Sequence, residues 1–521
     1  MRSDSDLSPE SQKMPDSGYK WRVLSTVVVG LFMVILDSTV INVALKTLQQ
    51  HFSVSTSQAQ WVISLYTLAL GISTPLSGFL GDRFGVKRIY LSGLGLFMLG
   101  SFLCGIAPSL TILIIARGIQ GIGGGIALPL GTALLFRAFP PRERGAAFGI
   151  FGIVLVFAPA IGPLLGGWLV DHNLLSWIFF LNLPIGAFGL TIGTRFLHEA
   201  PGSASMQADI PGIILAALGF GAILFASSLA GETGVGWGDP RVIASLTVGV
   251  VALIIFTFVE LRTSQPLLDL KLFRIPSFAL ANLTGLVGTI ALFGAEFLLP
   301  LYLQILRGET AFSTGLILLP LAIASAFSTV IGGRLVDRIG PRVPIVIGFV
   351  LIAYNTFQLS QIRLDTSINF IIFLLVLRGI AIGLIIQNSQ VAALMDVPPA
   401  RLNRATPLVQ ATRQTMQSIG VALLATILSS AVTVTLPAGG AFGGNSVNVP
   451  PTARAAAAQT LHQFQSQYIT GLEHAYLVTC IVAIIATLLA LFLPGWPGKY
   501  QSNASLRRAE SAPQAQPTSV A

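Results

Sequence analysis

The stretch Gly78-Phe-Leu-Gly-Asp82-Arg83-Phe-Gly85-Val-Lys87-Arg88 is a short charged break between two long apolar runs. A near copy, Gly333-Arg-Leu-Val-Asp337-Arg338-Ile-Gly340-Pro-Arg342, follows in the second half of the chain, and the two Asp-Arg pairs lie 255 residues apart. A charged turn that recurs between apolar segments indicates a bundle of membrane helices in which one half repeats the other. The repeat therefore predicts both the class of protein and a charged hinge on one membrane face.

The composition of the 521 residues supports a membrane bundle. Only 10% of the residues are charged and 53% are hydrophobic, whereas soluble domains carry about 25% charged residues. The net charge of +9 is spread over short loops between the apolar runs, which argues against a nucleic-acid partner. The two cysteines both lie in apolar runs, so neither a disulfide framework nor a metal site is expected.

Fourteen apolar runs have the length of about 20 residues that a bilayer core requires of a helix. They predict an all-α polytopic membrane protein with 14 transmembrane helices. The spans are expected near residues 22–45, 59–80, 88–107, 109–136, 145–170, 176–197, 210–230, 240–261, 277–303, 313–334, 343–361, 368–394, 407–435 and 474–495. Most of the 30 Lys and Arg fall on the side that holds both termini. Because Lys and Arg are retained in the cytoplasm, both termini and both Asp-Arg turns are expected there, and the protein in the cytoplasmic (inner) membrane.

A second repeated motif predicts how the chain is divided. Ala116-Arg117-Gly118-Ile-Gln-Gly121 in the fourth span resembles Leu377-Arg378-Gly379-Ile-Ala-Ile-Gly383 in the twelfth, at an offset of 261 residues. Two pseudo-symmetric six-helix bundles are therefore expected, with two inserted helices between them. The expected boundaries are 1–18 for a polar cytoplasmic tail, 19–199 for the first bundle, 200–265 for the inserted helices, 266–499 for the second bundle and 500–521 for a disordered cytoplasmic tail. Residues 436–470, rich in Gly, Ala, Pro and Gln, are expected to form the longest outer loop.

Five motifs in this order resemble the major facilitator superfamily and, within it, the fourteen-helix drug:proton antiporters (multidrug efflux permeases). They are the turn at 78–88, 36–45 in the first span, 158–167 in the fifth, 177–186 at the start of the sixth, and Arg413-Gln414 with Gly420 in the thirteenth. The resemblance covers roughly residues 20–495. It implies a transporter that exchanges protons for drugs. Lys46 departs from the pattern, because the family usually has Pro at that position.

Asp37 lies inside the first span, where an ionised carboxylate costs about 2.5–3.5 kcal/mol unless it meets water or a partner. Such a group suits the binding and release of a proton, and the resemblance implies that an acid at this position takes part in coupling. Glu296 lies in the ninth span at an offset of 259 residues, so the duplication predicts a second acid near the central cavity. Two facing acids would suit a cationic or proton-exchanging site. For both residues the alternative is a carboxylate that only contacts water or neighbouring helices.

Arg117 lies near the middle of the fourth span and cannot discharge, so it needs a carboxylate or several carbonyls. Asp37 is the candidate partner. An Arg that moves toward or away from an acid changes the affinity of that acid for protons, which couples conformation to protonation. The resemblance implies such a role for Arg117, and the alternative is an Arg that only holds the bundle together. Both interpretations also stay open for Arg378, its repeat mate.

The Asp-Arg turns are expected to act as conformational latches rather than as binding sites. Asp82 and Asp337 lie at helix ends, where a carboxylate can meet the positive N-terminus of a neighbouring helix or a nearby Arg. Such contacts exist only while the cytoplasmic side is closed, so they would favour the outward-facing state. The residues assigned to the latches are Gly78, Asp82, Arg83, Gly85, Arg88, Asp337 and Arg338. The first turn is expected to be the stronger latch, because the second has Val343 in place of Arg88.

Ala158, Gly162 and Gly166 recur every four residues, which puts them on one helix face and lets a neighbouring helix approach closely. Pro163 removes a backbone donor and bends the helix. With Gly167 these residues resemble the antiporter motif of helix 5, which implies a pliable seal against the other half. Ordinary small-residue packing is the alternative. The candidates for the substrate cavity are Asn42, Tyr66 and Phe293.

The function predicted from these residues is proton-coupled export of amphipathic small molecules, such as several drugs or dyes, by alternating access. The alternative is a dedicated exporter of one metabolite, siderophore or lipid-like compound, since both kinds of exporter share the motifs. An enzyme is not expected, because the five His are scattered and no phosphate-binding loop or metal-ligand spacing occurs. No cofactor is expected. The expected partners are a small-molecule substrate, protons and the lipid bilayer, with a periplasmic adaptor protein as a further candidate and no nucleic acid.

Overall fold

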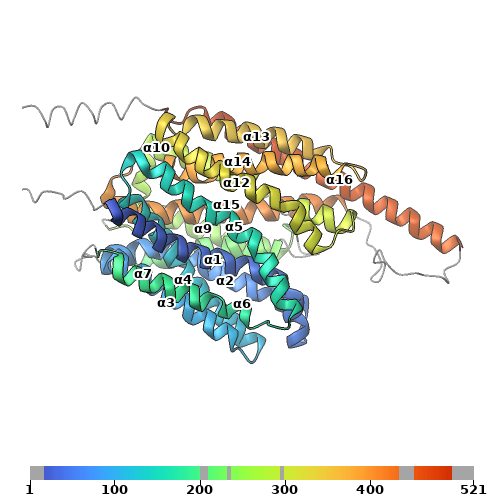
Figure 1. Ribbon diagram of the computed structural model, residues 1–521, viewed down its shortest axis with the longest axis horizontal. Coiled ribbons are helices and arrows are strands. Elements are labelled where there is room, and N and C mark those ends of the chain that lie inside the picture. The colour runs from blue at the N-terminus through green and yellow to red at the C-terminus, as the bar shows by residue number, and fades with distance from the viewer. Residues whose placement is uncertain are drawn as a thin grey trace, which may run out of the picture.

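Every regular element in the described part of the chain is a helix (Figure 1). The computed structural model describes residues 17–199, 209–230, 236–263, 265–293, 298–432 and 451–495. Most of the long helices run along the long axis of the molecule, as the helices of a membrane bundle do.

The first half of the chain begins with a helix that is longer than predicted and ends with a span in two pieces. Its helices are α1 (Ser17–Phe52), α2 (Thr56–Phe84), α3 (Val86–Gly105), α4 (Leu110–Ala138), η1 (Pro141–Glu143), α5 (Arg144–Asp171), α6 (Trp177–Phe180) and α7 (Asn182–Phe196). α6 and α7 together occupy the sixth predicted span. The start of α2 is fixed by a capping box, in which Ser55 and Gln58 satisfy each other's backbone N–H groups.

The inserted pair and the second half follow the same pattern. The inserted helices are α8 (Ile210–Ala230) and α9 (Pro240–Arg262), and the second half contains η2 (Leu270–Arg274), α10 (Pro276–Phe293), α11 (Leu298–Leu301), η3 (Tyr302–Leu306), α12 (Ala311–Ile339), α13 (Arg342–Ser360), α14 (Ile368–Leu394), η4 (Pro399–Arg401), α15 (Leu402–Ala431) and α16 (Pro451–Ala490). The ninth predicted span thus differs from expectation, because its described residues form α10, α11 and a π-helical turn, η3, rather than one α-helix.

The two Asp-Arg turns have the same backbone form, as the duplication predicts. Gly85 follows α2 with φ 98° and donates its N–H to the carbonyl of Gly81. Gly340 follows α12 with φ 84° and donates to the carbonyl of Val336. Residues with a side chain rarely adopt this backbone conformation, so glycine is required at both turns.

The number of membrane helices agrees with the prediction. Thirteen helices among the described residues are long and apolar enough to cross a membrane. α15 is 30 residues long and packs against α2, α10 and α16 within the bundle, which makes it the fourteenth, although its middle is polar. The predicted all-α fold with 14 transmembrane helices is therefore confirmed.

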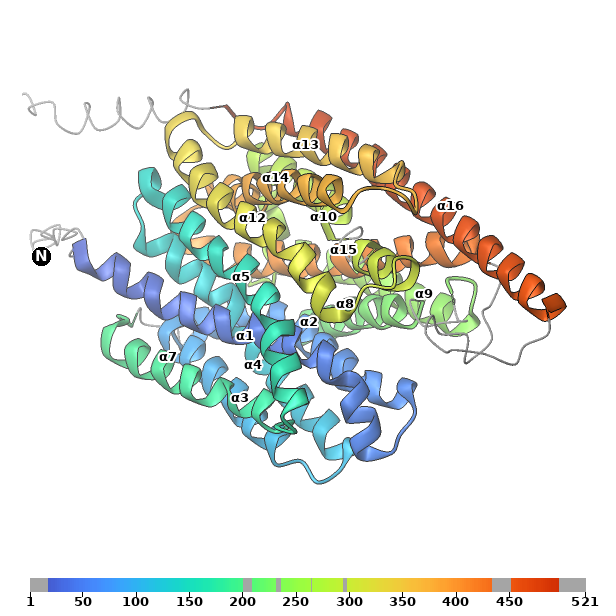
Figure 2. The ribbon, with the colours of Figure 1, turned by 45° about the vertical axis from the view of Figure 1, so that its right-hand side comes forward.

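The two halves meet along two helix pairs. α5 packs along α12, and α2 packs against α15. The inserted helix α8 packs on α9 and also against both α2 and α15, so the inserted pair lies beside the second of these seams. Figure 2 shows α16 extending beyond the other helices at one end of the bundle.

The opposite end of the bundle is held together by polar contacts. Lys20 at the start of α1 forms an ion pair of 2.5 Å with Glu143, just before α5. The start of α5 in turn lies beside Asp337 at the end of α12. We call this end the terminal face and the other end the distal face.

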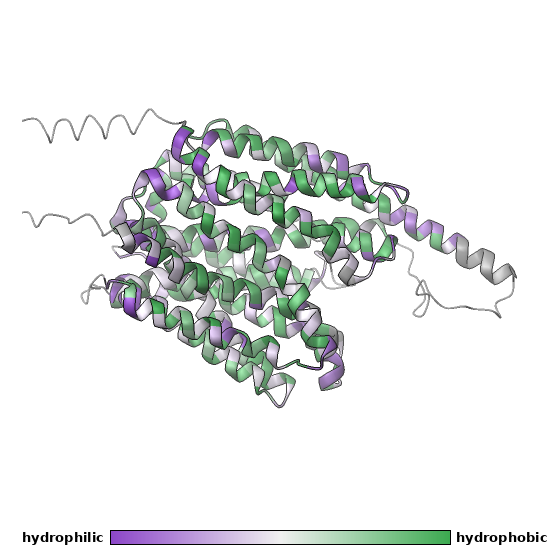
Figure 3. Ribbon diagram, in the orientation of Figure 1, coloured by the Kyte–Doolittle hydropathy of each residue, from purple (hydrophilic) through white to green (hydrophobic). Residues whose placement is uncertain are grey.

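The surface of the bundle has the hydropathy of a membrane protein. Figure 3 shows hydrophobic residues along the middles of the helices and hydrophilic residues mostly near their ends. Large apolar side chains are exposed on the surface, among them Phe258 (62%), Phe327 (70%) and, just after α16, Phe492 (76%). Such exposure is favourable only where the surroundings are lipid. The chain is a multi-pass membrane protein.

The prediction of an outer loop at residues 436–470 was wrong in part. α16 begins at Pro451 and runs without a break to Ala490, so it projects beyond its neighbours on the distal face (Figure 1). Residues 451–470 are rich in Ala and Gln, which makes them too polar for a membrane span but good helix formers. Residues 436–450 lie outside the described part of the chain.

Candidate functional site

Asp37 is enclosed in the first half of the molecule. It lies in the interior of α1, and its side chain is 1% exposed. Its Oδ2 accepts a hydrogen bond of 2.5 Å from Nη1 of Arg117. Its Oδ1 accepts from Nε2 of Gln120 at 2.8 Å and from Nδ2 of Asn182 at 2.7 Å. The carboxylate therefore ties α1 to α4 and α7.

Arg117 is the counter-charge of this carboxylate. It is fully buried, its Nη1 also donates to Oε1 of Gln120 at 2.7 Å, and its Nε donates to the carbonyl of Val62 at 3.2 Å. The guanidinium carbon lies 4.0 Å from the ring centre of Tyr66, which is a cation–π contact. A charge this deep is stable only because a carboxylate, a carbonyl and an aromatic face surround it.

Ser101 of α3 completes the set of side chains around the ion pair. Its Oγ accepts from Nε2 of Gln120 at 3.2 Å and from Nδ2 of Asn182 at 2.8 Å, and it donates to the carbonyl of Phe179 at 2.8 Å. We call Asp37, Ser101, Arg117, Gln120 and Asn182 the Asp37 network. Because it balances one negative charge against one positive charge, adding a proton to Asp37 would leave Arg117 without a counter-charge, and removing one partner of a buried pair costs about 3–5 kcal/mol.

The first Asp-Arg turn joins the two halves at the terminal face. Oδ1 of Asp82 accepts from Nδ2 of Asn403 at 2.5 Å, and its Oδ2 accepts from Nε of Arg404 at 3.0 Å. Both partners lie at the start of α15. Gly78 permits this approach, because a Cβ atom there would lie 2.3 Å from the carbonyl oxygen of Asn403. α2 and α15 are thus in backbone contact beside an ion pair.

The second Asp-Arg turn joins the halves through a helix N-terminus. Oδ1 and Oδ2 of Asp337 accept from the backbone N–H groups of Gly145 and Ala146, both at 2.8 Å. These groups belong to the first turn of α5, where N–H groups lack partners within the helix and the helix dipole attracts an anion. A Cβ atom on Gly333 would lie 2.1 Å from the carbonyl oxygen of Gly145, so this seam is also closed at backbone distance.

The sequence of the chain also matches a known protein family. A family model described as Major Facilitator Superfamily matches residues 27–425. The chain belongs to the Major Facilitator Superfamily. Its duplicated turns, its two inserted helices and its two seams therefore belong to a transporter fold.

Curated relatives of this superfamily member cover most of its length. "Uncharacterized MFS-type transporter YhcA" of Bacillus subtilis is 37% identical over 79% of this chain and 77% of the relative. "Lincomycin resistance protein LmrB" of Bacillus subtilis is 33% identical over 90% and 95%. "Multidrug resistance protein Stp" of Mycobacterium tuberculosis is 35% identical over 78% and 75%. Matches to resistance transporters confirm the recognition of the chain as a relative of the superfamily's drug:proton antiporters.

A solved structure confirms the fold of this superfamily member. The human organic anion transporter MFSD10 (TETRAN) superposes with a TM-score of 0.60 at 15% sequence identity, over 89% of this chain and 99% of that one. At this identity the likeness concerns the fold alone.

The arginines assigned to the latches also lie at the terminal face. Their described contacts stay within one half of the molecule. Arg83 lies over the rings of Phe79 and Phe84 of its own helix, at 5.9 and 5.4 Å. Arg88 is exposed and lies 3.6 Å from Glu199. Arg338 is exposed. The described contacts that join the halves at these turns are made by Asp82, Asp337, Gly78 and Gly333.

The small-residue face of α5 needs a correction. The seal implied for Gly162 and Gly166 was against the other half, but both face α1: a Cβ on Gly162 would lie 2.1 Å from Oγ1 of Thr39, and one on Gly166 would lie 2.9 Å from the carbonyl oxygen of Val40. Thr39 also donates to the carbonyl of Ala158 at 3.4 Å. Four-residue spacing fixes one helix face but not the neighbour that it meets. Gly167 has open space around it, and the side chain of Pro163 lies outside the described residues.

The candidates for the substrate cavity are scattered. Tyr66 is buried under Arg117 rather than facing a cavity. Asn42 is exposed, and Phe293 is half-buried in an apolar cluster with Phe349 and Ile382. Glu296 and the side chain of Lys46 lie outside the described residues. Arg378 is 3% exposed and donates to the carbonyl of Leu292 at 2.7 Å.

Sequence reasoning missed three members of the Asp37 network. Gln120 lies three residues after Arg117 and so shares its helix face, Asn182 lies in a quoted motif, and Ser101 is the least conspicuous. Each is a polar residue in an apolar run, which is the signal that would have pointed to them.

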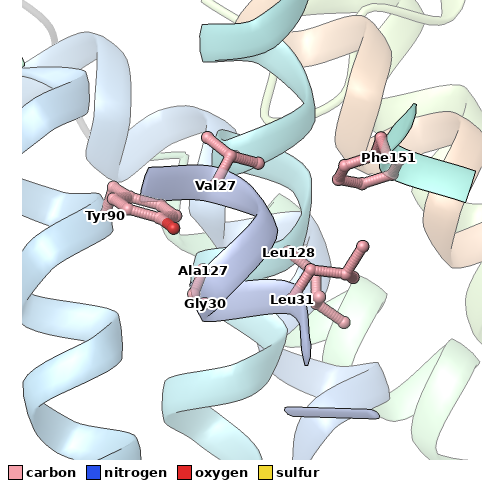
Figure 4. A pocket seen from close by; sticks show the side chains of 8 residues that line it. Val27, Gly30, Leu31, Tyr90, Ala127, Leu128 and Phe151 are labelled. Atoms are coloured by element: carbon pink, nitrogen blue, oxygen red, sulfur yellow. The ribbon is translucent and has the colours of Figure 1, made fainter. Parts of the chain in front are cut away.

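The hollow beside the start of α1 is small and apolar. It is lined by residues of α1, α3, α4 and α5, among them Val27, Tyr90 and Phe151 (Figure 4). The Tyr90 hydroxyl donates to the carbonyl of Thr26 at 3.1 Å. No member of the Asp37 network lines it. Among the described residues, no group of His, Cys, Asp and Glu side chains has the arrangement of metal ligands.

Proposed function

We propose that this membrane transporter is a proton-coupled antiporter that exports amphipathic small molecules by alternating access. The observation that carries the proposal is the buried ion pair of Asp37 and Arg117, at 2.5 Å, with both side chains at most 1% exposed. A titratable acid enclosed with a permanent cation is suited to exchange a proton and to change the local structure when it does.

The proposed coupling runs from the Asp37 network to the second latch. A proton on Asp37 removes the charge that holds Arg117, so α1 can separate from α4 and α7. α1 also packs on α5 through Thr39, which contacts Ala158 and Gly162. The first turn of α5 binds Asp337 across the seam. A shift of α1 is thus transmitted by one packed helix to the contacts that close the terminal face.

We assign the terminal face to the cytoplasm, with both chain termini on that side of the inner membrane. Lys and Arg gather there, as they do on cytoplasmic faces. With both latches formed at that face, the structure corresponds to an outward-facing conformation. A proton gradient supplies about 2.3 kcal/mol per 100 mV for each charge moved, which is adequate for a cycle of this kind, and the chain is assigned no enzymatic activity.

The proposal is tested by transport into inverted membrane vesicles. An imposed inside-acid gradient should drive uptake of a fluorescent dye by the full-length protein. Asp37→Asn should abolish the dependence of uptake on the gradient, because an amide cannot exchange a proton. Asp239→Asn is the matched control, since Asp239 lies on the distal loop and pairs with its neighbour Arg241. Gradient-driven uptake by Asp37→Asn at the wild-type rate would overturn the proposal.

A dedicated exporter of one compound is the second candidate. It is favoured by relatives that are named for resistance to lincomycin alone, whereas others are named for multidrug resistance. A growth-inhibition screen of cells that express the protein separates the two. Protection against chemically unrelated compounds supports the polyspecific exporter, and protection against one compound supports the dedicated one.

A further inference from the structure

The middle of α15 carries a polar stripe that the proposed coupling does not use. Its residues recur at i, i+3, i+4, i+7 and i+8, which places them on one face of the helix. They are Gln410, Arg413, Gln414, Gln417 and Ser418. All five are half-buried, unlike the lipid-facing apolar residues of other helices. We call this face the α15 stripe.

The side chains of the α15 stripe make no hydrogen bond or ion pair with any residue that the structure describes. Their neighbours on the same helix behave differently: Thr412 and Thr415 donate to the backbone of the preceding turn at 2.7 and 2.9 Å. A polar group without a partner in a membrane costs several kcal/mol unless water reaches it. The polar groups of the stripe therefore need water or a bound molecule as partners.

The position of the stripe is between the two halves. Gln414 lies against Gly71 of α2, since a Cβ on Gly71 would lie 3.9 Å from its side-chain carbon. Gly420 lies against Ile290 of α10, since a Cβ on Gly420 would lie 3.1 Å from the Cα atom of Ile290. Gly71 is about 7.5 Å along α2 from Tyr66, at ~1.5 Å per residue. The stripe thus lies one to two helical turns from the level of the Asp37 network.

The charges in the middle of the bundle differ in their access to water. Asp37 and Arg117 bind each other and are at most 1% exposed, and Arg378 is 3% exposed against a backbone carbonyl. Arg413 combines a permanent charge with partial exposure. Within the described membrane interior, it is the charged group that a molecule in the pathway can reach.

We propose that Arg413 is the residue that selects substrates with a carboxylate, by binding that group in the transport pathway. The inference rests on the proposed export function and names its substrate class. A guanidinium presents two parallel N–H donors that match a carboxylate. The amides of Gln410, Gln414 and Gln417 surround it with further donors on the same face. The substrate is then an amphipathic molecule with a free carboxylate, rather than the cation that two facing acids would suit.

The test compares two dyes that differ only in this group. Rhodamine 110 has a free carboxylate and rhodamine 123 is its methyl ester. Binding to the full-length protein in detergent is measured by fluorescence polarisation for wild type, Arg413→Gln and Arg413→Lys. Arg262→Gln, which removes an exposed charge at the end of α9, is the matched control. Uptake driven by an inside-acid gradient is measured in liposomes with the same proteins.

Wild type and Arg262→Gln should bind the free acid at least about tenfold more tightly than the ester, and Arg413→Gln should lose this preference. Arg413→Lys should keep part of it, because the charge remains but the fork is lost. A wild-type protein without the preference, or an Arg413→Gln variant that retains it, overturns the inference. Equal weakening of both dyes by Arg413→Gln also overturns it. An intact preference without gradient-driven uptake counts against the proposed antiport and supports the assignment of Arg413.

Discussion

At the scale of single residues, the carboxylate of Asp37 is held by three donors that arrive from two other helices. Arg117 supplies a charge, whereas Gln120 and Asn182 supply neutral N–H groups at 2.8 and 2.7 Å. Hydrogen bonds to an ionised group are worth about 1.5–3 kcal/mol each. The carboxylate of Asp37 is therefore fixed by three contacts in the conformation seen here.

Tyr66 provides a test of how Arg117 is held. The ring lies 4.0 Å from the guanidinium, whereas its hydroxyl makes only a long hydrogen bond of 3.4 Å to the carbonyl of Val34. Tyr66→Phe keeps the ring and should cost less than about 1 kcal/mol. Tyr66→Ala should cost about 3–5 kcal/mol, because it removes a buried ring and its cation–π contact. Thermal unfolding of the protein in detergent measures both, and equal losses would contradict this role of the ring.

Much of the residue-scale chemistry was predictable from the sequence, and some was not. Asp37 and Arg117 stand out because charged residues are rare in membrane spans, and the contact expected between them is present. Gln120 and Asn182 carry no charge, and whether an amide points inward depends on the rotation of its helix, which one sequence does not define. The role of the network in coupling stays a prediction.

At the scale of elements, α5 works as a two-sided helix. Its first turns lie against α12, where Gly149 and Gly152 approach Thr329, and its later turns lie against α1. The two faces use small residues in the same way but serve different neighbours. Four-residue spacing in the sequence predicted a close contact, and only the structure identified α1 as its partner.

The seam between α5 and α12 should be sensitive to a single methyl group. Gly333→Ala places a Cβ 2.1 Å from the carbonyl oxygen of Gly145, which is backbone and cannot move aside. The terminal ends of α5 and α12 should separate, and the population with an open terminal face should rise. Gly315→Ala on the same helix meets no atom within 4 Å and should leave the population unchanged.

The separation is measured as a spin-label distance between Phe84 and Ile339, which are exposed at the terminal ends of α2 and α12. If Gly333→Ala and Gly315→Ala gave the same distance distribution, close packing at this seam would not control the conformation.

At the scale of the whole molecule, the two Asp-Arg turns join the halves at the terminal face by different means. Asp82 uses the side chains of Asn403 and Arg404, whereas Asp337 uses two backbone N–H groups. Each latch needs to contribute only a few kcal/mol, because about 5.5 kcal/mol shifts a two-state equilibrium from 1:99 to 99:1. In the proposed alternating-access cycle both contacts must also be released, so contacts that were too strong would slow it.

Loss of either latch should shift the molecule toward the inward-facing state. Asp82→Asn removes the ion pair with Arg404, and Asp337→Asn replaces one of two acceptor oxygens at the start of α5 with a donor. The spin-label distance between Phe84 and Ile339 should lengthen in both variants, with the larger change for Asp82→Asn if the first turn is the stronger latch. Unchanged distances in the double variant would show that neither carboxylate acts as a latch.

The division of the chain into halves and membrane spans was more predictable than the packing contacts between its helices. Repeated turns with offsets of 255 and 261 residues define two matching halves, and hydropathy defines the spans. The position of the inserted pair beside α2 and α15 was not predictable, because it depends on packing between lipid-exposed helices whose apolar surfaces are alike. The helical residues 451–470 were missed because hydropathy does not register helix propensity.

The polar middle of α15 also has a consequence for how the chain enters the membrane during synthesis. An Arg at the centre of a span costs about 2.5–3.5 kcal/mol at the insertion machinery, and Arg413 is accompanied by three Gln on the same face. α15 is therefore a poor candidate to partition into lipid alone. Its insertion depends on helices already in place, among them α2, α8 and α10. A chain that has just been synthesised to the end of α15 therefore does not yet have its final membrane topology.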